Sequence, residues 1–266
     1  MADPARETHF VQSLERGLAV IRVFDAAHPE LTLSEVARAC DITRAAARRF
    51  LLTLVDLGYV QSDGRMFRLG PRILELGYAY LSSIGLPDIA QPHLKRLVHE
   101  VHESSSVCVL DGDDIVYVAR VPTSRIMTVS ITVGTRFPAY LTSVGRVLLA
   151  HLPEQEVELY LKRVPLTRPT ARTVASTSML RTELHRIRDQ GYAIVDQELE
   201  EGLRSVAAPI RDGNGGVVAA VNIPVHASRN SIDSIRRDLV PALVAAASRI
   251  EADLRLMPGP ATRARA

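Results

Sequence analysis

The chain has 266 residues, of which 47% are hydrophobic and 23% charged, and its formal net charge is +2 at pH 7. This composition excludes a disordered chain and a strongly polybasic one, and the length is sufficient for two domains with separate cores. Residues 1–10 lack the apolar run of a signal peptide, and no later stretch is apolar for long enough to cross a bilayer. We therefore expect a cytoplasmic protein with no membrane contact.

The first predicted element is a helix over residues 13–27, where apolar side chains recur at helical spacing and Ser13 is placed to cap the N-terminus. A second helix is predicted over residues 33–40, because Thr32 and Glu35 have the spacing of a capping box. In that motif each side chain accepts a hydrogen bond from a free backbone N–H at the start of the helix. The two helices predict the scaffold of a small helical domain.

A third helix follows a turn of two residues, with Thr43 as its cap and a set of apolar residues at helical spacing that we expect to face the core: Ala46, Phe50, Leu51, Leu54 and Leu57. Residues 42–55 contain no acidic residue, so the opposite side of this helix is cationic. Arginines reach guanine edges and phosphates in the major groove, and small residues allow close approach. We therefore expect this helix to contact double-stranded DNA through Thr43, Arg44, Ala45, Arg48 and Arg49.

Two short alternating segments, at residues 59–61 and 66–69, flank a Ser-Asp-Gly turn and predict a hairpin. The hairpin completes a winged helix-turn-helix over residues 13–70, with Arg65 and Arg68 on the wing near backbone phosphates. Residues 1–85 contain ten arginines, no lysine and ten acidic residues, so the distribution of charge, and not its sum, favours DNA. The alternative is a winged helix that serves only as a protein-interaction module.

Residues 71–85 predict a linker helix with apolar side chains on more than one side, which favours packing against a second copy of the chain. Residues 86–257 alternate helices with antiparallel strands, between tails at residues 1–12 and 258–266. The predicted strands lie at residues 106–110, 115–121, 127–133, 206–211 and 217–224, and the predicted helices at residues 86–102, 144–152, 154–162, 179–190 and 232–254. This is an α+β pattern, and helices beside a largely antiparallel sheet can enclose a ligand pocket.

Signals for catalysis or metal binding are weak. The acidic run at residues 196–201 has no histidine at ligand spacing, and His99 and His102 have no matching cysteine or carboxylate. Cys40 and Cys108 are too few for a disulfide framework, and we expect both to be packing residues. We expect no metal, no cofactor and no enzymatic activity. The alternative is an enzyme with an appended DNA-binding domain and its active site in the acidic run.

Six segments carry a family resemblance that extends over residues 13–256. They are SLERGLAVI, LTLSEVARACDITRAAARRFLLTLVDLGYV, FRLGPRILELG, LTSVGRVLLAHLP, GYAIVDQELEEGLRSVAAPI and AAVNIPV. Together they resemble the IclR-type bacterial transcriptional regulators. The run RVPTSRIMTVSITVGTRFPAYLTSVGRVLLA further resembles the Pca and Pob branch, which regulates the catabolism of protocatechuate, 4-hydroxybenzoate and β-ketoadipate.

The resemblance implies a GAF-like C-terminal domain that binds a small organic acid, either an aromatic acid or a β-ketoadipate-like one. It also implies a homodimer or tetramer that places two or more DNA-binding domains on operator DNA. Matching the family motifs residue by residue gives Ser143, Val144, Ser205 and Asn222 as expected effector-binding residues, with Pro224 on the same strand as Asn222. Met127 and Val129 are expected to add apolar walls against a ring or a methylene chain. The sequence therefore predicts a DNA-binding regulator whose operator affinity depends on a bound acid, with the linker helix as transmitter.

Three positions depart from the glyoxylate-sensing branch of that family. Asn222 and Pro224 stand where that branch has serines, and Val195 replaces an acid, so we do not expect glyoxylate as the effector. Three arginines are candidate partners for a ligand carboxylate: Arg136, Arg146 and Arg204. The alternative for each arginine is a surface or interface role.

Overall fold

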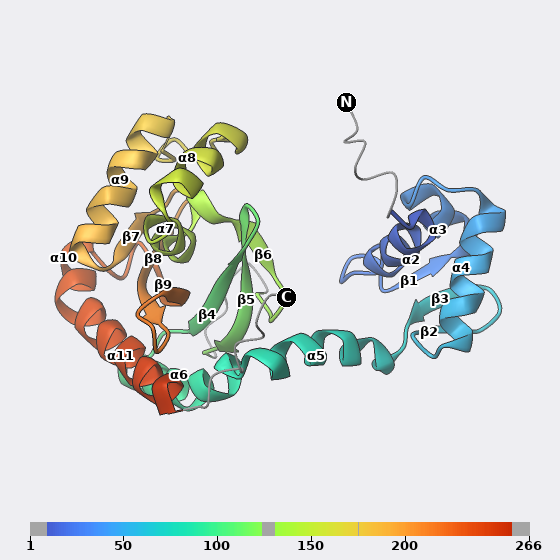
Figure 1. Ribbon diagram of the computed structural model, residues 1–266, viewed down its shortest axis with the longest axis horizontal. Helices are drawn as coiled ribbons and strands as arrows, with labels where there is room; N and C mark the ends of the chain where they lie inside the picture. Colours follow the sequence, from blue (N-terminus) through green and yellow to red (C-terminus); the bar gives the residue numbers. More distant parts are fainter. Residues whose placement is uncertain (1–9, 124–130, 175, 257–266) are drawn as a thin grey trace, which may run out of the picture. The chain divides into compact units, whose positions relative to one another are not determined.

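The structure, a computed structural model, describes residues 10–123, 131–174 and 176–256. The chain divides into two compact units, Met1–Ser83 and Ile84–Ala266 (Figure 1). The first unit contains a helix-turn-helix with a wing, and the second combines a sheet with helices, so the predicted α+β architecture is confirmed. No helix in the described part of the chain is long and apolar enough to span a membrane.

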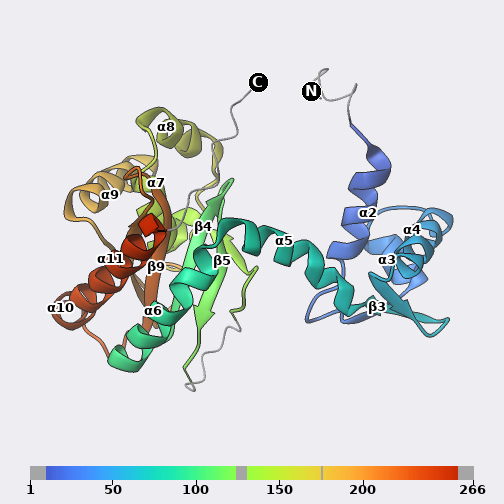
Figure 2. The ribbon, with the colours of Figure 1, turned by 60° about the horizontal axis from the view of Figure 1, so that its bottom comes forward.

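The first unit packs helices against a three-stranded antiparallel sheet with the strand order β1-β3-β2 (Figure 2). Its elements are α2 (Gln12–Arg22), β1 (Glu30–Thr32), α3 (Leu33–Ala39), α4 (Arg44–Asp56), β2 (Val60–Ser62) and β3 (Met66–Leu69), followed by the 3-10 turn η1 (Pro71–Ile73) and α5 (Leu74–Ile84). Val20, Val36, Ala47 and Leu51 form the fully buried centre of this unit. β1 was not among the predicted strands, and it pairs with β3 on the side away from β2.

Local side-chain hydrogen bonds determine where α3 and α4 begin. The Thr32 hydroxyl accepts a bond from the Glu35 N–H (3.4 Å), and the Glu35 carboxylate accepts one from the Thr32 N–H (2.7 Å). This is the predicted capping box. Thr43 caps α4 as predicted, because its hydroxyl accepts a bond from the N–H of Ala46 (3.2 Å). The predicted cap at Ser13 is wrong, since α2 begins at the preceding residue and has no side-chain cap.

The C-terminal ends of the first and third predicted helices also differ from expectation. α2 stops at Arg22, before the predicted end at residue 27, because Asp25 captures backbone groups that a helix would need. Its carboxylate accepts bonds from the N–H groups of Ala27 (2.9 Å) and His28 (2.7 Å), which close a turn. Leu57 was predicted to face the core, but it lies just beyond the end of α4 and is exposed.

The second unit is built on a six-stranded antiparallel sheet with the strand order β6-β5-β4-β9-β8-β7. The strands are β4 (Ser105–Asp111), β5 (Asp114–Val121), β6 (Arg136–Pro138), β7 (Ala193–Asp196), β8 (Leu203–Arg211) and β9 (Val217–His226). Both predicted hairpins are present, whereas the edge strands β6 and β7 were not predicted. In the predicted strand at residues 127–133, residues 131–133 are not in a strand, and the rest lies outside the described residues.

Helices cover both faces of this sheet. α6 (Leu86–Val101) and α11 (Val240–Leu256) lie side by side on one face, as both ribbon views show (Figures 1 and 2). α7 (Ser143–Ala150) packs on the other face. The remaining elements are the 3-10 turn η2 (Ala139–Leu141), α8 (Glu154–Arg163), α9 (Thr177–Gln190), the short α10 (Ile232–Ser234) and the π-turn η3 (Ile235–Leu239).

One glycine sets the distance between η2 and α7. A Cβ atom on Gly145 would lie 2.1 Å from the carbonyl oxygen of Ala139, so the two backbones can touch only because this residue has no side chain. Thr142 joins the two elements and caps α7 by accepting a bond from the Gly145 N–H (2.9 Å). This contact holds Leu141 and Thr142 against the sheet, where they line the pocket described below.

Candidate nucleic-acid interface and internal pocket

The structure brings the predicted DNA-contacting residues together around the start of α4. All five are exposed, while the opposite side of the helix buries Ala47, Leu51 and Leu54 in the core: the exposed set is Thr43, Arg44, Ala45, Arg48 and Arg49. α4 therefore presents a rigid cationic face. The Thr43 hydroxyl is already engaged in capping the helix, so it orients this face from within the protein.

The arginines of this face are free of internal partners. The side chains of Arg44, Arg48 and Arg49 form no ion pair with any residue that the structure describes, and the first turn of α4 contains no acidic residue. The first N–H groups of a helix also lack intrahelical acceptors and carry partial positive charge. Unpaired guanidinium groups at such a terminus provide a site for phosphate or base edges.

The two wing arginines differ in their contacts. Arg65 stands at the tip of the β2–β3 turn, where its backbone N–H and that of Met66 bind the Asp63 carboxylate and lower its pKa. The Arg65 side chain is exposed and has no ion pair within the described part of the chain. Arg68, predicted to lie near phosphates, is instead bound to Glu30 (3.1 Å). The structure thus leaves one of the two predicted wing arginines available.

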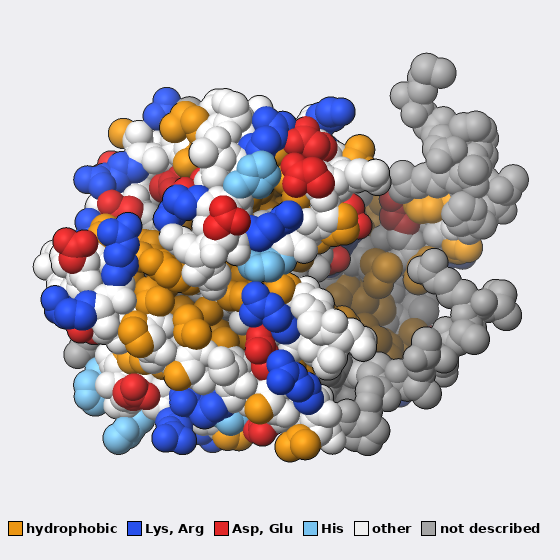
Figure 3. Space-filling view, turned by 60° about the vertical axis from the view of Figure 1, so that its left-hand side comes forward, with side chains coloured by type: hydrophobic (Ala, Val, Ile, Leu, Met, Phe, Trp, Pro, Cys, Tyr) orange, Lys and Arg blue, Asp and Glu red, His pale blue; other side chains and the backbone are white. Residues whose placement is uncertain are grey.

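The surface of the second unit has a different character. On the face in Figure 3, Lys and Arg side chains are interspersed with Asp and Glu around an area of hydrophobic side chains. Ion pairs in this unit include Arg186 with Glu183 and Arg237 with Asp238. This mixture of charges does not resemble the cationic face of α4.

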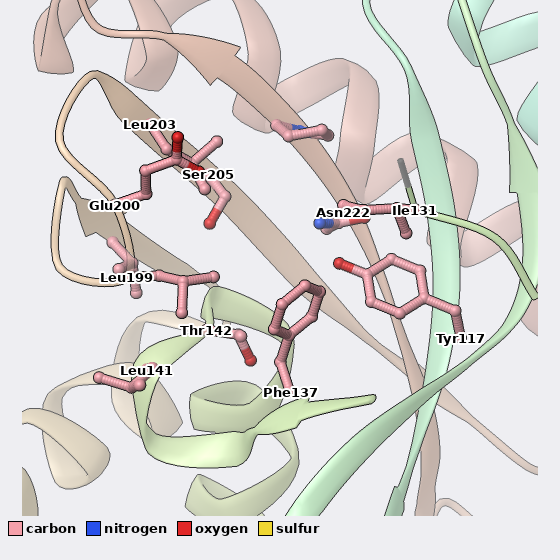
Figure 4. Close-up of a pocket in the computed structure, with 12 residues that line it drawn as sticks. Tyr117, Ile131, Phe137, Leu141, Thr142, Leu199, Glu200, Leu203, Ser205 and Asn222 are labelled. Carbon is pink, nitrogen blue, oxygen red and sulfur yellow. The ribbon is translucent and has the colours of Figure 1, made fainter. Parts of the chain in front are cut away.

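A pocket of about 260 Å³ lies in the second unit, between the α7 side of the sheet and the segments around it (Figure 4). Its apolar walls are Ile131, Phe137, Leu141, Val195, Leu199, Leu203 and Pro224, and its polar lining is Tyr117, Thr142, Glu200, Ser205 and Asn222. A dry cavity of about 150 Å³ already accommodates benzene. The volume and walls therefore suit one aromatic ring or a short chain with polar substituents.

Polar groups converge on one side of this pocket. Asn222 is only 5% exposed and its Oδ1 has no hydrogen-bond partner among the described residues. In Figure 4 the Asn222 amide nitrogen and the Ser205 hydroxyl point into the pocket, and the Tyr117 hydroxyl points toward Asn222. Burial raises the pKa of Tyr117, so its phenol remains a neutral donor. These groups can bind an oxygen-bearing ligand.

The predicted effector-binding residues are only partly gathered at this pocket. Ser205 and Asn222 line it. Ser143 and Val144 are fully buried in the first turn of α7, next to Thr142, and are not among the lining side chains, although the Ser143 hydroxyl is buried without a hydrogen-bond partner in the described structure. The predicted apolar walls Met127 and Val129 lie outside the described residues.

The three candidate counterions already have internal partners. Arg136 binds Asp111 (2.6 Å) and Asp114 (3.2 Å) on the surface. Arg204 binds Asp196 and the backbone carbonyls of Ala227 (3.0 Å) and Asn230 (2.6 Å), while Arg146 binds Glu198. None of these guanidinium groups lines the pocket.

The Arg146–Glu198 pair is structural. The two side chains are joined by two hydrogen bonds of 2.7 and 2.6 Å, and Arg146 is 1% exposed. Arg146 also donates to the carbonyl of Tyr140 (2.8 Å), and Glu198 accepts a bond from the N–H of Val174 (2.8 Å). The pair therefore links α7 to the loop that supplies Leu199 to the pocket wall.

The acidic run at residues 196–201 does not form a carboxylate cluster. Asp196 and Glu198 are each held by an arginine, and Glu200 alone of the run's acids lines the pocket. Within the described part of the chain, no three His, Cys, Asp or Glu side chains are placed to hold a metal ion. The acids of the run therefore contribute two structural ion pairs, through Asp196 and Glu198, and one lining side chain, Glu200.

Comparison with known proteins gives matches in both units. A model of the IclR helix-turn-helix domain matches residues 13–64, and a model of the bacterial transcriptional regulator IclR C-terminal domain matches residues 78–252. The chain is 44% identical over 238 residues to the Pca regulon regulatory protein of Pseudomonas putida, an alignment that covers 89% of this chain and 82% of that protein.

Solved structures of similar proteins also match the chain over most of its length. A crystal structure of a protein from Rhodococcus sp. RHA1 has 59% sequence identity and a TM-score of 0.84, covering 92% of this chain and 98% of that one. An IclR homologue from Microbacterium hydrocarbonoxydans, crystallised in complex with 4-hydroxybenzoate, has 27% identity and a TM-score of 0.83. That comparison covers 92% of this chain and all of the other.

Proposed function

Since the chain belongs to the IclR family of bacterial transcriptional regulators, we propose that it binds operator DNA through α4 and the wing, and that a small organic acid in the C-terminal pocket controls this binding. In this proposal residues 13–70 are the DNA-binding domain, residues 71–85 the linker helix and residues 86–257 the effector-binding domain. The family is one of transcriptional regulators, and we assign the pocket no catalytic role. A regulator of chromosomal genes acts in the bacterial cytoplasm.

The observation that carries the DNA-binding role is the set of unpaired, exposed arginines on one rigid element and the adjacent wing tip: Arg44, Arg48, Arg49 and Arg65. Thr43 and Ala45 complete the surface, the first by fixing the start of the helix and the second by allowing close approach. Base contacts from α4 supply specificity, while the wing supplies phosphate contacts that position the domain.

The proposed effector is an aromatic acid or a β-ketoadipate-like acid. The pocket supports this assignment through its apolar walls and through the donors on Ser205 and Asn222. The proposal keeps Ser143 and Val144, which follow the lining residue Thr142 at the start of α7 and whose backbone N–H groups have no intrahelical acceptor. The names of the Pseudomonas relative and of the 4-hydroxybenzoate complex favour a role in controlling aromatic-acid catabolism genes.

We propose that the chain acts as a homodimer or a homotetramer. The first unit leaves apolar side chains of α2 and α5 uncovered, and Leu74 and Tyr78 are 72% and 70% exposed. A groove of about 500 Å³ runs between these helices, lined chiefly by Phe10, Val11, Leu14, Leu18, Ile21 and Leu76. A second copy of the same surface would cover it, as an isologous interface requires.

The test combines ligand and DNA binding on the full chain. Protocatechuate, 4-hydroxybenzoate and β-ketoadipate are screened by thermal shift, and we expect at least one to raise the unfolding temperature. That acid should change the affinity for DNA from the promoters of aromatic-acid catabolism genes in a gel-shift assay. Salt-dependent DNA binding separates this function from a protein-interaction module. Failure of every acid to stabilise the protein would remove the effector assignment.

A further inference from the structure

One arginine on the sheet that forms the pocket has no carboxylate partner within the described structure, unlike Arg136, Arg146 and Arg204. Arg120, on β5, is half-buried and donates a hydrogen bond to the hydroxyl of Ser106 (3.2 Å). It forms no ion pair with any described residue. Burial lowers the pKa of this guanidinium, yet an arginine remains cationic at neutral pH. A positive charge is therefore held partly out of water without a carboxylate.

The sheet register places Arg120 on the face that lines the pocket. Ser106 is directly opposite Arg120 in the β4–β5 pair and directly opposite Asn222 in the β4–β9 pair. Opposed residues in antiparallel strands project to the same face. Arg120, Ser106 and Asn222 thus form a row across three strands, and Asn222 lines the pocket. Tyr117, which also lines the pocket, is opposite Cys108 in the β4–β5 pair, two residues along β4 from Ser106 and therefore on the same face.

We propose that Arg120 is the residue that recognises the carboxylate of the effector, an inference that rests on the proposed function. The lining residues in the described part of the chain include no cation, and the charged residue among them is Glu200, which is exposed. An anion entering such a pocket needs a positive partner to compensate for lost hydration. Arg120 lies on the same face of the sheet as Asn222 and has no carboxylate partner among the described residues, and its planar guanidinium matches the two oxygens of an acid.

This assignment also orients the ligand. The carboxylate lies at the β4–β5 side, toward Arg120, with the Tyr117 hydroxyl and the Asn222 amide as neighbouring donors. The ring or carbon chain then extends toward the apolar side chains of Phe137 and Leu199. An uncharged analogue keeps the apolar contacts but loses the charge-assisted hydrogen bonds. Discrimination between an acid and its amide therefore measures the contribution of Arg120.

The experiment uses the full chain and isothermal titration with the acid that stabilises the wild type best among protocatechuate, 4-hydroxybenzoate and β-ketoadipate. The uncharged analogue is the primary amide of that acid, or the diamide in the case of β-ketoadipate, which has two carboxylates. We expect the wild type to prefer the acid by roughly ten- to hundredfold, the range of a charge-assisted pair. Arg120→Gln should lose that preference and leave amide binding unchanged. Arg136→Gln is the matched control, because Arg136 is already bound to Asp111 and should leave acid binding unchanged.

The outcomes separate this inference from the proposed function. If the acid binds wild type and Arg120→Gln equally well, the inference is overturned and the proposed function stands. If no acid on the panel binds the wild type, both fail. Should the Gln variant not fold, Arg120→Met serves in its place, since it keeps an unbranched stem without the charge: a loss of acid affinity with none for the amide supports the role of Arg120, and equal affinity for the acid overturns it.

Discussion

The arginines around α4 differ in what they contribute to DNA binding. Arg48 projects from α4, the helix that we propose enters the DNA major groove, whereas Arg65 stands at the tip of the wing. Arg48→Ala should reduce operator affinity by about 1–3 kcal/mol more than affinity for unrelated DNA, because a base contact is lost. Arg65→Ala should weaken binding to both DNAs equally and reduce the magnitude of the slope of log affinity against log salt by about one.

Fluorescence anisotropy with operator and unrelated duplexes over a salt series measures both effects. Arg68→Ala is the matched control on the same wing, because Arg68 is occupied by Glu30 and should leave the salt slope unchanged. Unchanged operator affinity in both the Arg48 and Arg65 variants would contradict the proposed roles.

A second prediction at the residue scale concerns the effect of Gly145 on stability and on effector binding. Gly145→Ala introduces a Cβ atom that would lie 2.1 Å from the Ala139 carbonyl oxygen, so η2 must shift away from α7. We expect a loss of about 1–3 kcal/mol in the free energy of unfolding. Effector affinity should fall as well, since Leu141 and Thr142 line the pocket. Urea denaturation measures the first effect and titration the second. Gly213→Ala, where a Cβ meets nothing within 4 Å, should change neither.

Residues with local signals could be predicted from the sequence, and residues defined by tertiary partners could not. Thr43 and Arg48 were assigned from helix spacing and capping, which depend on neighbours in the chain. Arg120 was not a candidate, because its position beside the pocket follows from strand register. Arg146 was a candidate counterion, but its buried bond to Glu198, far away in the sequence, gives it another role. An unpaired arginine cannot be told from a paired one without the fold.

At the scale of elements, the capping box of α3 predicts a dependence on pH. Hydrogen bonds from the backbone and side chain of Thr32 lower the pKa of Glu35 below its ordinary value of 4.5. A carboxyl group with a lowered pKa stabilises the folded state above its unfolded pKa, and this stabilisation is lost as the pH falls through the folded pKa. Glu35→Gln should therefore weaken α3 at pH 7 and differ little from the wild type in strong acid.

Amide hydrogen exchange of α3 in the intact chain measures this effect. Wild type and variant are compared with each other at pH 7 and again at pH 3, so that the intrinsic pH dependence of exchange cancels. A difference in protection that is equally large at both pH values would show that the charge of Glu35 does not stabilise the helix.

The link between α7 and the pocket loop predicts strong coupling between Arg146 and Glu198. Replacing one partner leaves a buried charge unpaired, and we expect Arg146→Met or Glu198→Leu to cost about 3–5 kcal/mol of unfolding free energy. The double variant should recover most of this loss, because both charges are then removed. Chemical denaturation of all four proteins gives the coupling energy. Additive losses would contradict a direct interaction.

Elements could be predicted where capping and periodicity are strong. The helices α3 and α4 have side-chain caps that the sequence displays, and their starts were correct. The end of α2 could not be foreseen from periodicity, because the turn closed by Asp25 competes with the helix. β6 and β7 were missed, since each is an edge strand of only three or four residues, too short for a clear alternating pattern, that forms by pairing with a single neighbouring strand. The two central hairpins bring their own turns and were predicted.

At the scale of the whole molecule, the uncovered face of α2 and α5 predicts the state of association. Leu14→Glu places a charge in the groove lined by both helices, and it should convert the assembly to a smaller species. Operator affinity should fall with it, because a smaller species links fewer DNA-binding domains and so loses part of their combined binding. Light scattering coupled to gel filtration measures the mass. Leu159→Glu, an exposed leucine on α8, is the control and should leave the mass unchanged.

The way in which the pocket is built determines which of its residues can be varied to change ligand specificity. The wall residue Leu199 belongs to a loop whose attachment to the fold depends on Arg146 and Glu198, and the wall residue Leu203 begins β8. Neither Arg146 nor Glu198 lines the pocket, so the two leucines can be replaced without removing the ion pair that holds the loop. A library randomised at the two leucines should yield proteins that respond to new acids while melting near the parental temperature, which makes this scaffold suitable for engineering genetic biosensors.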